Sequence, residues 1–459
     1  MNYLNQDCIA ALSSASGKSA IAVIRLSGET SFHIIEQIFQ TKPRADKSET
    51  DKSASDKQIK YGHIVDGKEK IDEVLCSFFK SPNTYTGEDL VEISCHGNPL
   101  IIGEILNLLY KNGARPAEPG EFTYRAFLNG KKDLTQAEAV CALITSKTRT
   151  AAKAALNNVD GEFSAKIGLL KTKLTQLLSF IEVSLDHPEE DIMFLSRKEK
   201  SFRLSFLMET NQKLIDSYKI SRKLQTGLKA AIIGKPNAGK SSLLNAIVGK
   251  NRAIVTEIAG TTTDTIEEII DCRGIPLTII DTAGLRTHSN NEIEKLGQNK
   301  TKETLKTADI IIWVLDGSAP FDDCDREIAA YLKNENISVP LIKTINKIDL
   351  PSAITITGEA RVSAQTGSGI TELLDKIAEI SGICEHKEDY LMLNSRHFAA
   401  LQTAQTALSK AKQQYLIQDA DEIAAFEIRT ALSAYDDILG IDTQTDILDA
   451  IFKNFCIGK

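Results

Sequence analysis

The sequence predicts an α/β domain inserted into an α-helical domain and preceded by an α+β N-terminal domain. Stretches 131–160 and 383–439 contain neither Gly nor Pro, and 169–226 contains only Pro188. These stretches are rich in Ala, Leu, Gln, Lys and Glu, which favour helices. Between 228 and 382, short apolar runs alternate with helical patterns, which is typical of a mainly parallel sheet. A helical region that an α/β module divides indicates an insertion, because domains insert at surface loops without disrupting the host core.

Four segments follow from these patterns. The N-terminal domain occupies 1–120, the first helical segment 121–225, the α/β domain 226–382 and the second helical segment 383–459. In the N-terminal domain we expect strands at 21–26 and 91–94 and a helix at 100–110. In the α/β domain we expect a hairpin turn at Arg273 and Gly274 and strands at 230–233, 277–280, 310–315, 341–345 and 360–362.

The composition is that of a globular protein. The chain has 459 residues, with 54 Lys and Arg against 62 Asp and Glu and a net charge of −8. A hydrophobic content of 42% excludes a wholly disordered chain, and the acidic balance argues against a protein that mainly coats nucleic acid. The mean hydropathy is −0.15, and no apolar run reaches the ~18 residues of a membrane-spanning helix. The eight cysteines form no C-x-x-C pair and the N-terminus has no signal-peptide pattern, so we expect free thiols and a cytoplasmic protein.

A phosphate-binding loop is the strongest motif. Residues 234–241 fit G-x-x-x-x-G-K-[ST], after an apolar strand and before a helical pattern. Gly lets the backbone turn its N–H groups toward phosphate oxygens, Lys240 is expected to reach the β- and γ-phosphates, and the Ser241 hydroxyl is expected to ligate Mg²⁺. The residues expected at the phosphates are Asn237, Ala238, Gly239, Lys240, Ser241 and Ser242.

Two further motifs indicate a nucleotide site, and the second of them selects guanine. The D-T-A-G motif follows the strand at 277–280, where its Asp can hold a metal-bound water and its Gly can present an N–H to the γ-phosphate. In the N-K-I-D motif, Asp349 can accept two hydrogen bonds from the N1 and N2 edge of guanine, and adenine has no such donor pair. A backbone N–H at Ser363 or Ala364 is expected to contact the base O6. The motif residues are Asp281, Thr282, Ala283, Gly284, Asn346, Lys347 and Asp349.

Together, in this order, these elements resemble a TRAFAC-class GTPase with the Ras-like fold. The segment between the phosphate loop and D-T-A-G resembles a first switch. It contains Thr256, Glu257, Ile258, Ala259, Gly260, Thr261 and Thr262. Leu285 stands where Ras-type enzymes have a Gln that orients the attacking water, so hydrolysis must use another group. The Asn237 side-chain oxygen can ligate a monovalent cation that supplies the missing positive charge.

The flanking segments resemble the tRNA modification GTPase (MnmE, also called TrmE) family over essentially the whole chain. The resemblance rests on P-G-E-F-T-Y-R-A-F-L-N-G-K at 119–131, D-L-T-Q-A-E-A at 133–139, Y-T-G-E-D at 85–89, I-R-L-S-G at 24–28 and F-C-I-G-K at 455–459. It implies a homodimer whose N-terminal domain binds 5-formyl-tetrahydrofolate or a related folate. It also implies an FAD-dependent partner, MnmG, with which the family adds an aminomethyl or carboxymethylaminomethyl group to C5 of the wobble uridine (U34) of certain tRNAs.

The resemblance also implies particular residues. Potassium, across which the G domains pair during GTP hydrolysis, is expected at Asn237, Thr256, Ile258 and Thr261, and Mg²⁺ at Ser241 and Thr262. Glu294 is expected to orient the attacking water, with Glu292 as the alternative, beside Lys240 and Thr262 as catalytic residues. Folate is expected at Arg25, Glu88, Lys131 and Lys459. Thr263 replaces the usual Arg of the first switch, which puts only an Arg role in doubt.

Two other functions remain open on sequence grounds. One is a stand-alone GTPase of ribosome assembly, which predicts an RNA-binding appendage that the sequence after the G domain does not suggest. The other is a GTP-binding scaffold without turnover, which Leu285 favours. The sequence leaves open the tRNAs used, the final modification, the role of Cys456, the order of GTP hydrolysis and RNA chemistry, and the dimer affinity.

Overall fold

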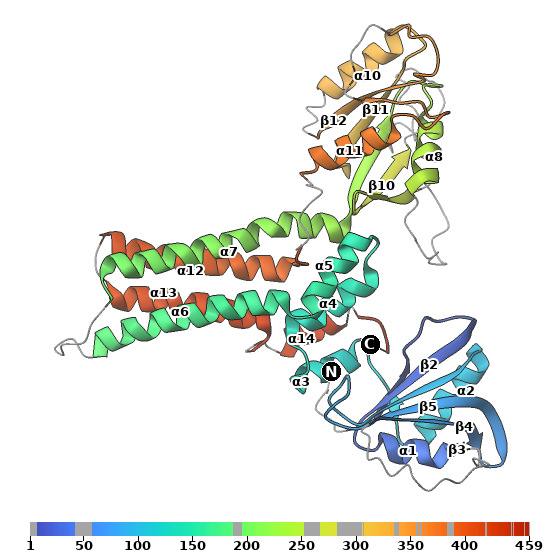
Figure 1. Ribbon diagram of the computed structural model, residues 1–459, viewed down its shortest axis with the longest axis vertical. Coiled ribbons are helices and arrows are strands. Elements are labelled where there is room, and N and C mark those ends of the chain that lie inside the picture. The colour runs from blue at the N-terminus through green and yellow to red at the C-terminus, as the bar shows by residue number, and fades with distance from the viewer. Residues whose placement is uncertain are drawn as a thin grey trace. The chain divides into compact units, whose positions relative to one another are not determined.

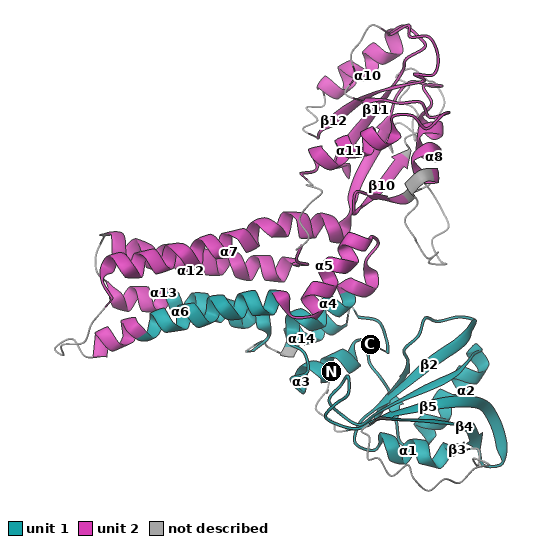
Figure 2. Cartoon of the chain, viewed as in Figure 1, with its two compact units in different colours: residues 1–141, 163–179, 428–459 teal, residues 142–162, 180–427 magenta. Residues whose placement is uncertain are grey.

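The structure is a computed structural model, and its contacts divide the chain into two compact units (Figures 1 and 2). Unit 1 comprises residues 1–141, 163–179 and 428–459, and unit 2 comprises residues 142–162 and 180–427. The residues that the structure describes are 7–41, 57–186, 195–251, 267–281, 305, 307–334, 339–354, 358, 360–382, 390–417, 420–441, 443, 445–453 and 455–458.

Unit 1 is built on a seven-stranded sheet in the order β3-β4-β5-β6-β2-β1-β7. All of its pairs are antiparallel except β1 with β7, which is parallel. Its strands are β1 (Ile9–Leu12), β2 (Ser19–Ser27), β3 (Phe39–Thr41), β4 (Lys57–Asp66), β5 (Glu69–Phe79), β6 (Leu90–Gly97) and β7 (Arg115–Pro116).

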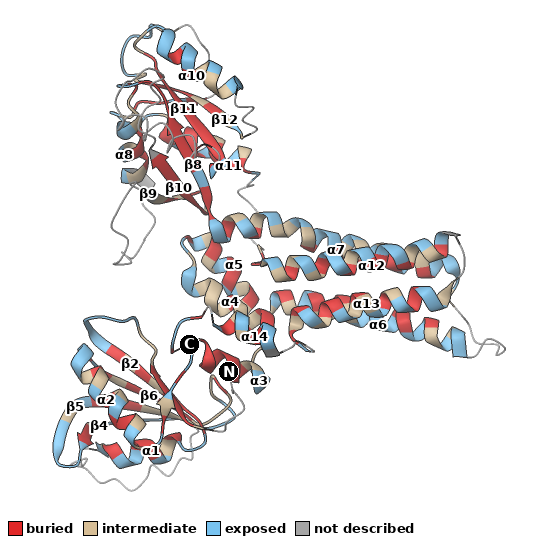
Figure 3. Ribbon diagram, turned by 180° about the vertical axis from the view of Figure 1, so that it is seen from behind, coloured by how far each residue is buried: buried red, intermediate tan, exposed pale blue. Residues whose placement is uncertain are grey.

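Two helices cover one face of this sheet. Helices α1 (Ser31–Ile38) and α2 (Pro99–Lys111) share a hydrophobic core with the strands, in which Ile24, Ile35 and Ile105 are fully buried. Helix α2 begins at Pro99 because Asn98 accepts the Leu100 N–H as an N-cap and Pro needs no donor at the first position. Along β5, buried residues alternate with exposed or intermediate ones, and Figure 3 colours the chain by this burial.

The remaining helices of unit 1 gather around aromatic side chains. Helices α3 (Glu121–Leu128), α4 (Leu134–Thr145) and α14 (Thr445–Phe452) pack around Phe452, which contacts the rings of Tyr124 and Phe455. Gly120, at a left-handed φ of 71°, leaves no room for a side chain, because a Cβ there would lie 2.7 Å from the Phe452 carbonyl oxygen. The C-terminal segment therefore packs closely on the start of α3.

Unit 2 contains a six-stranded sheet in the order β13-β12-β11-β8-β10-β9. Only the β9–β10 pair is antiparallel, and its hairpin turn at Arg273 and Gly274 has positive φ at both residues. Helices α8 and α11 pack on one face and α10 on the other. The elements are β8 (Leu228–Ile233), α8 (Lys240–Asn251), β9 (Glu267–Cys272), β10 (Ile275–Asp281), β11 (Ile310–Asp316), α10 (Asp323–Asn334), β12 (Leu341–Asn346), β13 (Ala360–Arg361) and α11 (Ile370–Ile380).

Long helices complete unit 2. Helix α7 (Arg197–Thr226) packs along α12 (Ser395–Ile417), where the buried Asn211 amide donates to the Leu401 carbonyl at 2.9 Å. Helix α5 (Arg149–Val159) shares one hydrophobic core with the sheet through Ala151 and Ala155. Helices α4, α6 (Glu162–Asp186) and α13 (Asp421–Leu439) contribute residues to both units.

The predicted fold class is confirmed, as are the strands expected in the N-terminal and α/β regions. The helical stretch 383–439 contains α12 and α13. The four segment boundaries stay predictions, since the two units follow another division in which the sheet and the long helices share unit 2. Among the described residues, no helix has both the length and the apolar character needed to cross a membrane.

Candidate nucleotide site and N-terminal polar cluster

The nucleotide motifs meet at one edge of the unit 2 sheet. The parallel strands β8, β10, β11 and β12 are neighbours, and β8, β10 and β12 are each followed by or end in a motif residue. Asp281 ends β10 in register with Ile232 of β8, and Asp316 ends β11 in register with Asn346. In open α/β sheets, ligands bind at the carboxyl ends of such strands.

The phosphate loop follows β8 and requires its two glycines. Gly234 has a φ of 155°, and a Cβ there would lie 2.5 Å from the Val314 carbonyl oxygen. A Cβ on Gly239 would lie 2.2 Å from the Asn346 amide nitrogen. Between them, Asn237 adopts a left-handed φ of 62° with an exposed side chain. The loop thus fits against β11 and β12 only because both positions lack side chains.

Lys240 closes over this loop. Its Nζ donates to the carbonyl oxygens of Gly234 and Lys235, each at 3.0 Å. Helix α8 begins at Lys240, so Ser241 and Ser242 occupy its first turn, where backbone N–H groups and the helix dipole favour an anion. Ala238 is buried beneath the loop, and both serines are exposed. The residues that are expected to contact the phosphates therefore lie next to one another, in the loop and the first turn of α8.

Asn346 joins the phosphate loop to the base-recognition loops. This fully buried side chain donates through Nδ2 to the Ala238 carbonyl at 2.9 Å and accepts the Ala364 N–H through Oδ1 at 3.0 Å. The Ser363 N–H donates to the Ser368 carbonyl at 2.9 Å. In this structure the two N–H groups expected to reach the base O6 therefore have acceptors within the protein.

Asp349 and Lys347 lie beside Asn346. The Ser363 hydroxyl donates to Asp349 at 2.5 Å, and Lys347, at a φ of 65°, forms an ion pair of 2.6 Å with Asp316. The other Asp316 oxygen accepts from the Ser318 N–H and hydroxyl. Burial alone would raise the pKa of Asp316, but the hydrogen bonds from Lys347 and Ser318 outweigh burial and lower it. Asp316 therefore stays ionised and anchors Lys347.

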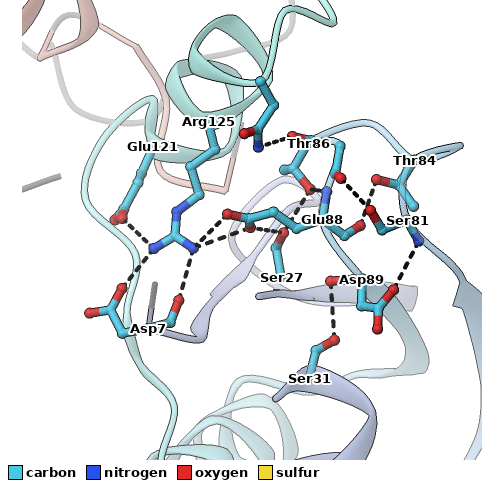
Figure 4. A network of polar contacts seen from close by, with 12 residues as sticks. Asp7, Ser27, Ser31, Ser81, Thr84, Thr86, Glu88, Asp89, Glu121 and Arg125 are labelled. Atoms are coloured by element: carbon cyan, nitrogen blue, oxygen red, sulfur yellow. Dashed lines mark hydrogen bonds and ion pairs between the residues drawn. The ribbon is translucent and has the colours of Figure 1, made fainter. Parts of the chain in front are cut away.

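A second polar cluster lies in unit 1 (Figure 4). The buried guanidinium of Arg125 donates to Asp7 at 2.8 Å, to Glu121 at 3.0 Å and to Glu88 at 3.2 Å. Glu88 also accepts from the Ser27 hydroxyl at 2.8 Å. A loop preceding β1, the loop before β6 and helix α3 thus converge on one buried cation.

The other predicted folate residues lie around the same loop. Arg25 forms an ion pair of 2.6 Å with Glu92, and its guanidinium lies 5.2 Å from the centre of the Tyr85 ring. Lys131 is exposed, and its Cγ would lie 3.3 Å from a Cβ on Gly87. The C-terminus reaches the same unit, because Ser13 donates to the Gly458 carbonyl at 2.8 Å.

Several predicted residues lie outside the described part of the chain. They are residues 256–262, 282–284, 292, 294 and 459. Sequence reasoning also missed two described groups. The apolar run of β11 ends in Asp316, which is a detectable signal for a residue at the ligand edge. No signal marks Arg125 as a hub, because Asp7 and Glu88 are distant from it in sequence and only Glu121 is near, four residues before it on α3.

The phosphate loop and the N-K-I-D loop lie together at the carboxyl ends of the parallel strands of the unit 2 sheet. This arrangement defines the nucleotide-binding part as a P-loop GTP-binding domain of the Ras-like fold. A family model described as MnmE helical domain matches residues 134–456, and one described as GTP-binding protein TrmE N-terminus matches residues 8–131. The chain belongs to the MnmE family of tRNA modification GTPases.

Curated relatives cover the whole chain. The tRNA modification GTPase MnmE of Endomicrobium trichonymphae is 58% identical, with 100% of both chains covered. That of Thermoanaerobacter pseudethanolicus is 42% identical, and that of Clostridioides difficile is 41% identical, each with 99% of both chains covered. Among solved structures, Aquifex aeolicus Era bound to GDP and AlF4⁻ is 26% identical over 39% of this chain and 66% of that chain. Its TM-score is 0.27, which is too low to add to the argument.

Proposed function

We propose that this chain hydrolyses GTP in a potassium-dependent reaction during which two G domains pair. We further propose that it works as a homodimer with MnmG to add an aminomethyl or carboxymethylaminomethyl group at C5 of U34 in certain tRNAs, in the cytoplasm. The chain is a GTP hydrolase of tRNA modification, as its family shows.

The phosphate loop supports GTP binding with Mg²⁺. Lys240 and the first turn of α8 present positive charge and N–H groups to the phosphates. The Ser241 hydroxyl is an oxygen donor in an exposed first turn, which fits the preference of Mg²⁺ for oxygen ligands and retained water. Bound there, the ion would help to neutralise the negative charge of the phosphates. Asp349 supplies the guanine contacts.

The observation that carries the potassium proposal is Asn237. Its side chain is exposed beside the expected phosphates, on a residue with a left-handed φ. The curated relatives of the chain are GTPases. Because Leu285 cannot orient water, a cation held by the Asn237 oxygen would supply positive charge, while Glu294 or Glu292 orients the water.

The unit 1 cluster supports a folate site. Tyr85 offers an aromatic face, Glu88 accepts hydrogen bonds through an oriented carboxylate, and Lys131 is an exposed cation beside the same loop. The end of the C-terminal segment lies in the same unit, where the Ser13 hydroxyl donates to the Gly458 carbonyl. A folate has the matching parts: a flat ring with N–H donors and an acidic tail. Bound there, it would supply a one-carbon unit.

Hydrolysis in potassium and in sodium tests the GTPase proposal. We expect fast turnover in potassium, slow turnover in sodium, and loss of activity in Asn237→Ala and Glu294→Ala. Asn245→Ala, at an exposed position of α8, is the matched control and should hydrolyse GTP normally. Glu292→Ala separates the two candidate glutamates. Equal rates in both salts would remove the potassium mechanism, and no turnover in either salt would favour a GTP-binding scaffold.

Nucleoside analysis of tRNA tests the RNA chemistry. Cells lacking this chain should lose the C5 substituent of U34, and the wild-type gene should restore it. Cells with Asn245→Ala should keep the substituent. Unchanged wobble uridines in the deletion strain would contradict the tRNA role, whatever the outcome of the GTPase assay.

A further inference from the structure

Lys235, the second residue of the phosphate loop, is a buried cation that the motif does not require. Its side chain is largely buried, and its Nζ lies 2.9 Å from Asp322 Oδ2 and 2.8 Å from Asp325 Oδ2. The motif G-x-x-x-x-G-K-[ST] leaves this position unspecified. A long, flexible side chain that is ordered between two carboxylates at such a position has a role that the motif alone does not describe.

The two carboxylates also form the start of α10. The Asp325 N–H donates to Asp322 Oδ1 at 3.1 Å, and the Asp322 N–H donates to Asp325 Oδ2 at 3.4 Å, which is a reciprocal cap. Asp325 is 1% exposed, and within the described residues its Oδ1 has no hydrogen-bond partner. A carboxylate buried this deeply depends on its ion pair, so Lys235 is its essential charge partner.

The backbone of Lys235 faces the nucleotide site. Its carbonyl accepts from Lys240 Nζ at 3.0 Å and from the Ala238 N–H at 3.3 Å. One residue therefore ties the start of α10, through its side chain, to the turn that holds Lys240, through its backbone. Movement of the Lys235 side chain away from α10 would displace the carbonyl that orients Lys240.

We propose that Lys235 is a positioning residue whose ion pairs with Asp322 and Asp325 hold the phosphate loop against α10 in the shape that binds the β-phosphate of a guanine nucleotide. This inference rests on the proposed GTP-binding function. Burial opposes the charge of Lys235, but the hydrogen bonds that it donates to Asp325 and Asp322 outweigh burial and raise its pKa. The tether therefore persists at neutral pH.

The test compares GDP with GMP, because GMP lacks the β-phosphate. In the full chain, Lys235→Met should weaken GDP binding about tenfold or more and GMP binding much less, since the charged hydrogen bonds that shape the loop are lost. Lys235→Arg should restore most of the GDP affinity. Lys229→Met, at an exposed position of β8 in the same domain, is the matched control and should bind both nucleotides normally.

A second variant, Asp322→Asn, tests the same inference if Lys235→Met does not fold. Asp322 is about half exposed, so Asp322→Asn removes one ion pair and keeps that of Asp325. It should fold, as circular dichroism will show, and weaken GDP binding severalfold more than GMP binding. Unchanged GDP affinity, or an equal loss for GDP and GMP, would overturn this inference while leaving the GTPase function intact. A wild-type chain that binds no guanine nucleotide would overturn both.

Discussion

The nucleotide site of unit 2 and the Arg125 cluster of unit 1 both depend on charged side chains, but they are assembled differently. The phosphate loop is a single stretch of eight residues, 234–241, and its cation Lys240 rests on two carbonyls of the same stretch. The Arg125 cluster draws its carboxylates from three places in the chain, at Asp7, Glu88 and Glu121. Its cation is 3% exposed, whereas the side chains of Ser241 and Ser242 face solvent.

Because of this difference, substitutions in the nucleotide site should mainly weaken ligand binding, and substitutions in the Arg125 cluster should mainly lower the stability of the fold. A site left open for phosphate has to keep positive charge available, so removing a group there weakens ligand binding more than folding. A buried cluster has its charges paired within the protein, so removing Arg125 takes a charge partner from Asp7, Glu88 and Glu121, of which Asp7 and Glu121 keep their ion pairs with Arg115. The variants below are ordered by the size of the effect that this comparison predicts.

Arg125→Met should produce the largest effect. We expect a loss of about 3 kcal/mol in the free energy of unfolding of unit 1, because Asp7, Glu88 and Glu121 each lose charged hydrogen bonds from the buried guanidinium, while Arg115 still pairs with Asp7 and Glu121. Native-state hydrogen exchange of unit 1 measures it locally, since a chain of two units need not unfold in one transition. The control is Lys111→Met, which removes an exposed ion pair with Asp66 and should cost less than about 1 kcal/mol. Equal losses in the two variants would contradict the comparison.

Asp316→Asn should weaken GDP binding roughly 10- to 100-fold, because the charged hydrogen bond that anchors Lys347 is lost. In a double-mutant cycle with Lys347→Met, the second substitution should add little, since Asp316 acts through Lys347. Asp309→Asn, at the exposed residue just before β11, is the control. Fluorescent GDP titration measures all four variants, and additive losses would show that Asp316 acts by another route.

Acid should weaken unit 1 through Glu121. Burial alone would raise the pKa of Glu121, but hydrogen bonds from Arg115 and the Glu118 N–H, with the charge of Arg125, lower it below the ordinary 4.5. The unfolded chain therefore binds more protons below pH 4.5. The stabilisation is present above 4.5 and is lost as the pH falls through the folded pKa. Hydrogen exchange against pH should show a shallower slope in Glu121→Gln than in Glu104→Gln, an exposed control on α2.

His96 should give the smallest effect. Its Nδ1 lies 2.6 Å from Asp72, and this hydrogen bond and the Asp72 charge raise the pKa of the exposed imidazole. The small stabilisation from this pair is present below the ordinary His pKa and is lost as the pH rises through the folded value. NMR titration should place His96 above 6.5, and Asp72→Asn should lower it. A pKa of His96 that does not respond to Asp72→Asn would contradict this assignment.

The sequence predicted the elements of both units well where local patterns suffice. The strand before the phosphate loop, the hairpin at Arg273 and Gly274 and the long helices follow from apolar runs and from the placement of Gly and Pro. It did not predict that the sheet of unit 2 and α5 share one hydrophobic core, since Ala151 and Ala155 reveal no partner by themselves. It also did not predict that the Ser363 N–H donates to the Ser368 carbonyl and the Ala364 N–H to the Asn346 side chain, because these pairs form only in the folded chain.

The sequence by itself determined the nucleotide motifs, their order along an α/β pattern and the resemblance that the relatives confirm. It could do so because a phosphate loop is contiguous, and its chemistry requires fixed residue types at fixed spacing. The tertiary structure alone decided that Arg125 gathers Asp7, Glu88 and Glu121, and that Lys235 joins the loop to α10. Charges pair across any distance in sequence, and only folding determines which carboxylates are buried beside which cation.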